Sequence, residues 1–354
     1  MNRKIRIFIV IWAMLATILA AGLVVFEVIR NFGSINLRSK IVNNAPLAVE
    51  SEEFTVEEES LQDWQDDWVK YNGEIYDYND EILTFLVMGI DKDEEIVVKS
   101  DTPAGGGQAD ALFLVVLDPV AKKTKIIGIN RNTMADVDVY DENGSYETTI
   151  TAQIAVQHGF GDGLEKSCLY QKRAVSNMLY DLPIHGYAAL NMSAISTITD
   201  ALGGVTLTPS RDFEMNGYSF KAGEPVTLDG ASARVYLSSR NTGQMSSADQ
   251  RLARQKEFLI AVINKVREEA ASDPKLMVDV FKAVTDQMVT DLTIDEVSYL
   301  APYVADFDFD EGSFYIPEGE TVMGKKYLEF YPDTDKLYEL LLKVFYNKVD
   351  ISRG

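Results

Sequence analysis

Two stretches of sequence decide the fold. Residues 82–91 read ILTFLVMGID, and residues 110–131 read DALFLVVLDPVAKKTKIIGINR. Both contain apolar runs of strand length, which are typical of strands buried on both faces. The Asp-Pro pair inside the second stretch begins a turn, because proline presets the backbone for a turn position. The two stretches therefore predict three strands at the centre of a sheet, at 82–90, 111–117 and 125–130.

Helical patterns and short extended segments alternate through the rest of the chain. Helices are predicted at residues 164–180, 193–202, 248–270 and 337–347, and a shorter helix is predicted to begin near Gly230. Sheets that are interleaved with helices in this way bury their apolar faces under those helices. The predicted fold class is α/β (α+β), with a central mixed β-sheet flanked by helices.

The N-terminal segment predicts a membrane anchor. Three basic side chains lie within residues 1–6, and residues 7–26 are uncharged and apolar. Twenty helical residues span roughly 30 Å, the thickness of a bilayer core. The alternative is a cleaved signal peptide, whose apolar region is usually about 7–15 residues long. We expect one transmembrane helix at 7–29, a cytoplasmic N-terminus, and the remainder of the chain outside the cell.

The predicted anchor is followed by an acidic region. Residues 41–69 contain nine acidic side chains and no basic one. Such a run is usually solvated and repels itself, so it favours an extended stalk. The sequence therefore predicts a stalk at 30–70 and a folded extracellular domain at 71–354.

Composition narrows the possible chemistry. The chain has 354 residues, 55 of them acidic and 33 basic, and its formal net charge is −22. Nucleic-acid binding is not expected of so acidic a chain, because phosphate backbones require a basic surface. The single Cys168 excludes an intramolecular disulfide and a cysteine-rich metal site. His158 and His185 are interpreted as structural, so catalysis should depend on carboxylates, Arg, Lys and hydroxyls.

One segment comes close to a phosphate-binding loop. Residues 319–326 read GETVMGKK, but Lys326 occupies the position where the motif needs a Ser or Thr hydroxyl for magnesium. A buried strand does not precede the segment either. We interpret it as a surface loop.

The predicted strands bring three charged residues together. A turn at residues 119–122 places Asp110 opposite Arg131 at the open end of the hairpin. Asp91 reaches the same edge if the strand at 82–90 runs parallel to the third strand. Paired carboxylates suit Mg²⁺, which binds through oxygen ligands and keeps several waters. The alternative is that these are ordinary charges at strand ends, and the geometry alone does not decide between the two.

A basic cluster stands out in this acidic chain. Between residues 231 and 256 the only acidic residue is Asp249, and the basic residues are Arg234, Arg240, Arg251, Arg254 and Lys256. Arginine is preferred for bidentate phosphate binding. Gln255 falls inside the apolar stripe of the predicted helix, with Arg251 at its edge, so Gln255 must find a partner or line a cavity. A solvated basic face is the alternative, and it explains Arg254 and Lys256 better.

With these motifs in place, the chain resembles the LytR–CpsA–Psr family of Gram-positive bacteria. The resemblance covers residues 80–265, and the ordered series of motifs is more specific than any one of them. In chain order the matching stretches are ILTFLVMGIDK from Ile82, QADALFLVVLD from Gln108, IGINRNTM from Ile127, GFGDGLEKSC from Gly159, HGYAALNMSAISTITDALGGVTLT from His185, LDGASARVYLSSR from Leu228 and RLARQKEFL from Arg251.

The resemblance implies a membrane-anchored extracellular phosphotransferase with Mg²⁺ as cofactor. Such enzymes transfer a glycopolymer, such as teichoic acid or capsule, from an undecaprenyl-pyrophosphate carrier to peptidoglycan, and lipid phosphate leaves. Carried over by position, Asp91 and Asp110 match the metal-associated aspartates. Asp110 and Arg131 are the expected catalytic residues, and Asp110 is the candidate that accepts the sugar hydroxyl proton. The expected pyrophosphate-binding residues are Arg131, Arg240, Arg251 and Gln255. An apolar pocket for the polyprenyl tail is expected between sheet and helices.

The chain departs from the family pattern at three positions. Ser238 replaces the first Arg of a phosphate-binding pair, and Asn132 replaces the Asp beside Arg131. The Arg often found just before the second aspartate is absent from Gly105-Gly106-Gly107-Gln108. We expect an extended segment in which Ser238 and Arg240 point to the same side. These departures favour a second interpretation, a catalytically weak protein that binds polyprenyl phosphates or cell-wall glycans. A transcription regulator is disfavoured by the anchor and the acidity.

Overall fold

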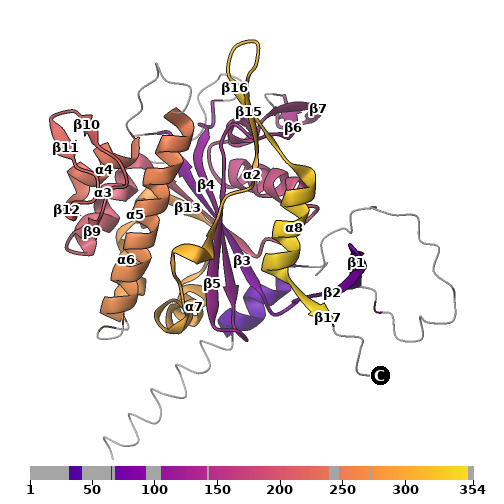
Figure 1. Cartoon of the computed structure of the whole chain (residues 1–354), viewed down its shortest axis with the longest axis horizontal. Coiled ribbons are helices and arrows are strands. Elements are labelled where there is room, and N and C mark those ends of the chain that lie inside the picture. The colour runs from indigo at the N-terminus through magenta and orange to yellow at the C-terminus, as the bar shows by residue number, and fades with distance from the viewer. Residues whose placement is uncertain are drawn as a thin grey trace, which may run out of the picture.

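A six-stranded mixed sheet forms the centre of the structure, which is a computed structural model (Figure 1). Its strand order is β13-β8-β3-β4-β5-β14. The strands are β3 (Leu83–Ile90), β4 (Ala109–Asp118), β5 (Lys123–Ile129), β8 (Gly186–Asn191), β13 (Met288–Thr290) and β14 (Phe314–Tyr315). The three strands predicted from the apolar runs are therefore confirmed as the centre of the sheet.

The structure describes most of the chain after residue 67. The described residues are 32–41, 65, 68–92, 105–141, 143–238, 247–270, 273 and 275–349. The predicted anchor at 7–29 and the predicted cytoplasmic residues 1–6 lie outside them. Among the described residues, no helix combines the length and the apolar character needed to span a bilayer.

Strand directions fix one edge of the sheet. β3 runs antiparallel to β4 and parallel to β8, and β4 runs antiparallel to β5. Consequently β3, β5 and β8 end at the same edge, where β4 begins; we call this the open edge. Leu112 pairs with Ile129 and Asp118 pairs with Lys123, so the predicted turn at 119–122 and its register are confirmed.

Helices cover both faces of the sheet. In Figure 1, α2 (Glu165–Met178) and α8 (Thr334–Phe345) lie to the right of the sheet, and α5 (Ser247–Ala270) lies to its left. Leu86 and Leu114 belong to the core cluster that α2 and α8 close. On the other face, Phe113 and Ile126 pack against Leu252 of α5. The alternation of side chains along each strand therefore feeds two cores, as expected for a sheet buried on both faces.

A smaller lobe packs beside α5. It contains α3 (Met192–Ala201), α4 (Gly230–Ser238), α6 (Leu276–Ala283) and the short strand pairs β9 (Val205–Leu207) with β12 (Val226–Leu228) and β10 (Phe213–Met215) with β11 (Tyr218–Phe220). The Asp229 carboxylate accepts a hydrogen bond from the Ser232 amide at 2.8 Å and so caps α4. Helix α4 continues through Ser238, so the expected extended conformation is wrong at that residue. Arg240 lies outside the described residues.

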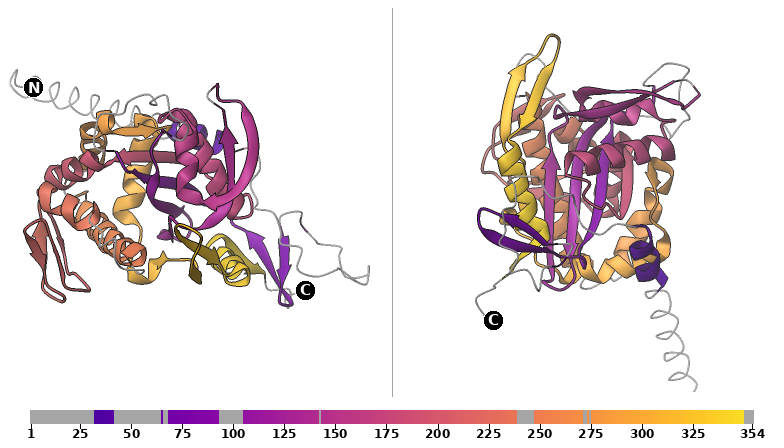
Figure 2. Two further views of the ribbon diagram at one scale, coloured as in Figure 1. Left: turned by 90° about the horizontal axis from the view of Figure 1, so that it is seen from above. Right: turned by 90° about the vertical axis from the view of Figure 1, so that its right-hand side faces the viewer.

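Two hairpins stand at the open edge. One pairs β6 (Met134–Tyr140) with β7 (Tyr146–Gln153) and leads into the 3-10 helix η2 (Ile154–Phe160). The other pairs β15 (Gly319–Met323) with β16 (Leu328–Pro332); we call it the arm. Both project from the same end of the sheet in Figures 1 and 2. The segment that resembles a phosphate-binding loop is thus one strand and the turn of the arm.

The opposite edge of the sheet receives the N-terminal portion of the described chain. Residues 32–39 form a helix within the region predicted as a stalk. Leu37 is fully buried beside Leu83 and Leu117, at the start of β3 and the end of β4. Arg38 forms an ion pair with Glu81 at 2.5 Å. This helix therefore packs on the domain, whereas most residues between 42 and 67 lie outside the described ones.

The remaining elements close the domain. β1 (Trp68–Tyr71) and β2 (Glu74–Tyr78) form a hairpin that turns at Asn72-Gly73, and β17 (Tyr346–Val349) pairs with β2. The other helices are α7 (Ile294–Asp306), η3 (Thr285–Gln287) and η4 (Glu311–Ser313). A capping box between Thr293 and Glu296 begins α7.

Candidate active site at the open edge

Three charged residues from three neighbouring strands meet at the open edge. Asp91 follows β3, Asp110 is the second residue of β4, and Arg131 follows β5 by two residues. The Arg131 Nη2 atom lies 3.0 Å from Asp110 Oδ1. The register predicted from the sequence sets these two residues opposite each other, and their ion pair agrees with it. The side chains of Arg131 and Asp110 are only 11% and 13% exposed, so solvent screens this pair weakly.

Helix α5 contributes a second arginine. Arg251 lies in the second turn of α5 and is 5% exposed. Its Nη1 donates to Asp110 Oδ2 at 2.9 Å, and its Nη2 donates to the Asp110 backbone oxygen at 3.3 Å. The two carboxylate oxygens of Asp110 therefore each face a guanidinium group. An anion that takes the place of this carboxylate would meet two preorganised cations.

Gln108 links the other members of the site. Its backbone oxygen accepts a hydrogen bond from the Asp91 amide at 3.1 Å, and its side-chain Oε1 accepts one from Arg131 Nη2. One residue thus ties the end of β3 to the arginine that follows β5. From the sequence Gln108 is only a departure from a family pattern, and nothing in the local sequence indicates this double contact.

A buried histidine holds the loop that carries Gln108. The His158 Nδ1 atom lies 3.1 Å from the Gly107 backbone oxygen, and the Gly106 amide donates to the Gly159 backbone oxygen at 3.2 Å. A Cβ at Gly106 would come within 2.8 Å of the His158 backbone oxygen, so only glycine allows this approach. Burial lowers the pKa of His158 to about 4. The ring is therefore neutral at pH 7, in agreement with the structural role predicted for it.

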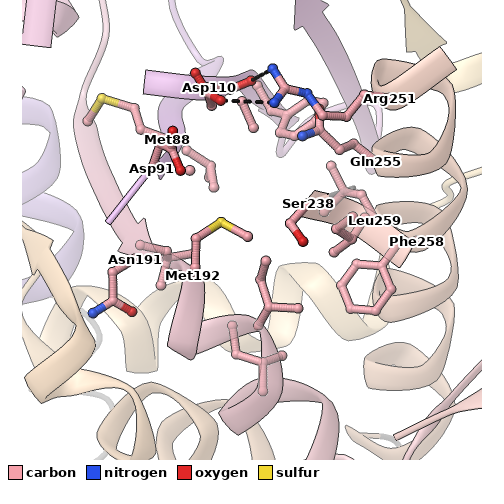
Figure 3. A pocket seen from close by; sticks show the side chains of 18 of the residues that line it. Met88, Asp91, Asp110, Asn191, Met192, Ser238, Arg251, Gln255, Phe258 and Leu259 are labelled. Carbon is pink, nitrogen blue, oxygen red and sulfur yellow. Dashed lines mark hydrogen bonds and ion pairs between the residues drawn. The ribbon is translucent and has the colours of Figure 1, made fainter. Parts of the chain in front are cut away.

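An apolar pocket opens directly beside the charged residues (Figure 3). Its volume is about 180 Å³, and it lies between the sheet and helices α3, α4 and α5. The apolar lining includes Val87, Phe113, Leu190, Ile198, Phe258 and Leu259. Asp91, Asp110, Arg251, Gln255 and Ser238 also line it. The pocket therefore combines a charged mouth with a hydrocarbon interior, which suits an amphiphilic ligand.

Gln255 and Arg254 point in different directions from α5. Gln255 lines the pocket one turn after Arg251, as expected for a polar residue within an apolar stripe. Arg254 points elsewhere: its Nε donates to the Tyr236 backbone oxygen at 2.7 Å, and its guanidinium lies 4.2 Å from the centre of the Phe213 ring. Arg254 therefore packs against the smaller lobe, and it is not among the residues that line the pocket.

Two carboxylates are the available metal ligands. Among the described residues, no group of three or more His, Cys, Asp and Glu side chains could enclose a metal ion. Asp91 and Asp110 nevertheless both reach the pocket mouth, and Asp110 Oδ1 is buried and accepts no hydrogen bond apart from its ion pair with Arg131. Mg²⁺ is commonly held by one or two carboxylates and completes its shell with water and phosphate oxygens. The donor set fits Mg²⁺ that arrives with a phosphate-bearing ligand.

Comparisons with known proteins agree with this fold and place the chain in a family. A teichoic acid transferase, TagU of Bacillus licheniformis, is 27% identical over 219 residues, which are 62% of this chain and 63% of that protein. The match to the first curated relatives thus spans less than two thirds of their length. The crystal structure of Bacillus subtilis TagV superposes with a TM-score of 0.58 at 21% identity, covering 75% of this chain and 96% of that one.

A second solved structure, TagT bound to LIIa-WTA, superposes with a TM-score of 0.54 at 20% identity, covering 75% of this chain and 89% of that one. At such identities the structures establish the fold alone. The sequence profile of the LytR_cpsA_psr family, however, matches residues 45–337, which is most of the chain. The chain therefore belongs to the LytR_cpsA_psr family.

Proposed function

We propose that this protein is a membrane-anchored extracellular phosphotransferase. It transfers a glycopolymer of teichoic acid or capsule type from an undecaprenyl-pyrophosphate carrier to peptidoglycan. The observation that carries the proposal is the charged mouth of Asp110, Arg131 and Arg251 placed directly on an apolar pocket. A polyprenyl pyrophosphate has the matching form, an anionic head on a hydrocarbon tail. The name of the Bacillus licheniformis relative, a polyisoprenyl-teichoic acid–peptidoglycan teichoic acid transferase, supports the same chemistry.

The head group would bind by exchange with Asp110. In the described structure the Asp110 carboxylate forms ion pairs with both Arg131 and Arg251. A pyrophosphate carries more charge than a carboxylate, so it would draw Arg131 and Arg251 toward its oxygens, with Gln255 as a neutral donor beside them. Arg240 is proposed as a further phosphate ligand from the segment after α4. Asp110, released from the two arginines, would then have one oxygen for the metal and the other for the proton of the acceptor hydroxyl.

The proposed transfer is a direct displacement at phosphorus and forms no covalent intermediate with the protein. The acceptor sugar hydroxyl attacks the phosphorus that carries the glycopolymer, and a new P–O bond forms. The bond from that phosphorus to the bridging oxygen breaks, and its electron pair leaves with the polyprenyl monophosphate. The hydroxyl proton passes to a carboxylate, for which Asp110 is our candidate. Catalysis then rests on alignment and charge neutralisation by Arg131 and Arg251.

Magnesium is proposed as the cofactor, with Asp91 and Asp110 as its protein ligands. When bound, Mg²⁺ would neutralise charge on the pyrophosphate oxygens. Asp91 is suited to this role because it lines the pocket mouth directly beside Asp110. Asp110 adds the second oxygen donor from the adjacent strand.

The membrane location is also a proposal. It is supported by the uncharged apolar residues 7–26 and by the three basic residues before them. An outside location would place the domain where its proposed acceptor, peptidoglycan, is found.

Replacing Arg251 tests the proposal directly. The full chain would be purified in detergent and given Mg²⁺, a lipid-pyrophosphate-linked glycopolymer and peptidoglycan fragments. Arg251→Ala removes one preorganised charge-stabilising donor, so turnover should fall about 10²–10³-fold. Lys265→Ala, on the same helix but in a surface pair with Glu269, should leave turnover unchanged. Undiminished transfer by Arg251→Ala would exclude this site as the phosphotransfer centre.

A weakly catalytic binding protein is the second candidate. One observation favours it: both oxygens of Asp110 already face arginines, and the pocket mouth has the uncharged Ser238 where the family pattern has a cation. The same assay separates the two functions. Saturable binding of the lipid donor without release of polyprenyl phosphate would identify the binder.

A further inference from the structure

The arm is bonded to the loop that carries Arg131. The Phe330 amide of β16 donates to the Asn132 backbone oxygen at 2.9 Å. Gln153 Nε2 donates to the Leu328 backbone oxygen at 2.7 Å and to Asn132 Oδ1 at 3.0 Å. The side chain next to Arg131 is therefore turned toward the arm. A ligand bound along β16 would therefore lie next to the loop that carries Arg131.

One face of the arm carries exposed polar-aromatic side chains. Glu329 and Tyr331 alternate along β16 and so share a face, while Phe330 points to the other face and is 8% exposed; Tyr327 lies in the bend just before the strand. Tyr327 is 67% exposed and Tyr331 is 43% exposed. The Tyr331 hydroxyl donates to Glu329 Oε2 at 2.8 Å, which fixes the carboxylate beside the Tyr331 ring. We call these three residues the tyrosine face.

The tip of the arm forms an open hollow next to this face. This hollow is shallow and open to solvent, and its lining includes Lys325, Lys326, Tyr327 and Glu329. A Cβ added at Gly324 would collide with the Glu329 carboxylate, so glycine leaves room for that carboxylate to lie over the tip. Two cations, a carboxylate and an aromatic ring thus converge on a surface that nothing in the described protein covers.

We propose that the tyrosine face and the arm tip bind the glycan strand of the acceptor. The proposal rests on the transferase function proposed above and adds the place where the second substrate docks. Tyrosine offers a rigid apolar ring with a polar edge, which suits the apolar face and hydroxyl rim of a pyranose. Glu329 accepts sugar hydroxyls, and Lys325 and Lys326 pair with carboxylates on the sugar or on the wall peptide.

The placement of the arm favours a glycan over other partners. Tyr327 lies at the tip of the arm and Tyr331 lies on β16, so the two exposed rings belong to an extended surface, which suits a chain of sugars better than one small molecule. A nucleic acid is disfavoured by the net charge of −22. A membrane surface is disfavoured because the Glu329 carboxylate lies beside the Tyr331 ring, and because the helix at 32–39 packs at the opposite edge of the sheet.

Sedimentation with cell-wall sacculi tests the proposal. The full chain would be mixed with peptidoglycan sacculi stripped of attached polymers, and bound protein would be measured after centrifugation. The double substitution Tyr327→Ala with Tyr331→Ala should weaken binding about tenfold, because two stacking rings are lost. Tyr218→Ala is the matched control, since Tyr218 is 37% exposed on the β10–β11 hairpin of the smaller lobe. The KM for a soluble muropeptide acceptor should rise by the same factor, with the KM for the lipid donor unchanged.

The outcomes are separable. Gly324→Ala displaces only the Glu329 carboxylate, and it should weaken sacculus binding while thermal stability stays at the wild-type value. Equal sedimentation of wild type and double variant would overturn the proposal, and so would loss of binding to phosphatidylglycerol vesicles with sacculus binding intact. Binding of the lipid donor is measured separately. If the wild type sediments with sacculi but does not bind the lipid donor, the transferase function is refuted, and the arm remains a glycan-binding element.

Discussion

At the level of single side chains, the site depends on a neutral residue between charged ones. Gln108 accepts from the Asp91 amide through its backbone and from Arg131 through its side chain. An arginine at this position would repel Arg131, whereas glutamine gives Arg131 an acceptor without neutralising its charge. Gln108 thereby fixes the direction of Arg131 without adding a second negative charge to that of Asp110. We interpret Gln108 as a positioning residue that acts through Arg131.

Replacing Gln108 should separate positioning from charge. Gln108→Ala removes one hydrogen bond to a charged group, so kcat should fall about tenfold while the KM for the donor changes little. Gln108→Glu should instead raise that KM, because a carboxylate beside Arg131 competes with the phosphate. Steady-state kinetics on one lipid donor measures both parameters. Identical kinetics for Gln108→Ala and wild type would remove Gln108 from the site.

Ser238 offers the reverse experiment, a gain of charge. It is the last residue of α4, lines the pocket mouth, and its hydroxyl donates to the Arg234 backbone oxygen at 2.7 Å. Ser238→Arg puts a cation at a helix C-terminus, where the helix dipole favours it. Affinity for the lipid pyrophosphate should rise several-fold at low ionic strength, and salt should abolish most of the gain. Ser238→Gln is the uncharged control; equal affinities of the two variants at low salt would contradict the prediction.

At the level of helices and strands, α5 joins the two halves of the site. Arg251 and Gln255 face the pocket mouth, and Phe258 and Leu259, a further turn along the helix, line the apolar interior. Residues four apart lie on one helix face, so a single rigid element sets the spacing between the anionic head and the hydrocarbon tail of a ligand. Changes in the apolar half of α5 should therefore affect tail binding without touching the charged mouth.

Filling the pocket from α5 tests this division. Leu259→Trp adds an aromatic ring to the apolar lining, so it should raise the KM for a long-chain polyprenyl donor about tenfold or more, or roughly 1.4 kcal/mol in binding. The variant should turn over a short-chain, water-soluble pyrophosphate analogue at the wild-type rate, because Arg251 is unchanged. Asn264→Trp, on an exposed position of α5, is the matched control. If turnover of both donors fell equally in Leu259→Trp, the pocket would not be the binding site of the polyprenyl tail.

The same elements show what the sequence can predict and why. The β4–β5 hairpin and its register follow from two apolar runs and a local Asp-Pro turn, so the meeting of Asp110 and Arg131 is predictable. The β6–β7 hairpin is not, because β7 is polar and exposed along most of its length. The pocket lining draws on β3, β4, β8, α3, α4 and α5, whose packing is non-local. Helix α4 reaches Ser238 because no helix-stopping residue precedes it, and for that reason the extended segment predicted there is wrong.

For the protein as a whole, two buried histidines connect stability to pH. His185 Nδ1 accepts a hydrogen bond from the Thr84 amide at 3.1 Å, which ties the chain before β8 to β3. Burial lowers the pKa of His185 to about 4, as it does for His158. A proton on Nδ1 would face the Thr84 N–H and remove its acceptor. The folded protein therefore disfavours protonation of both rings.

The two histidines should make the folded protein less stable as the pH falls. Between pH 6.5, where histidine titrates in the unfolded chain, and pH 4, the unfolded state binds protons that the folded state does not. Stability should therefore be complete above pH 6.5 and fall toward pH 4, by up to about 3 kcal/mol for each histidine. His185→Asn keeps an acceptor for the Thr84 amide and does not titrate. Its Tm should decline less than that of wild type between pH 7 and pH 5. Parallel declines would show that His185 does not contribute to the pH dependence of stability.

The burial of Leu37 against the start of β3 bears on how the proposed transferase would reach its lipid donor. Eight residues of β3 separate that contact from Asp91, a height of about 26 Å. A domain that stood upright on its tether would hold its reactive groups almost a bilayer core away from the headgroups. The proposed donor can then be reached in two ways: the domain lies down along the surface, or the prenyl chain is pulled out of the bilayer and sheltered in the pocket.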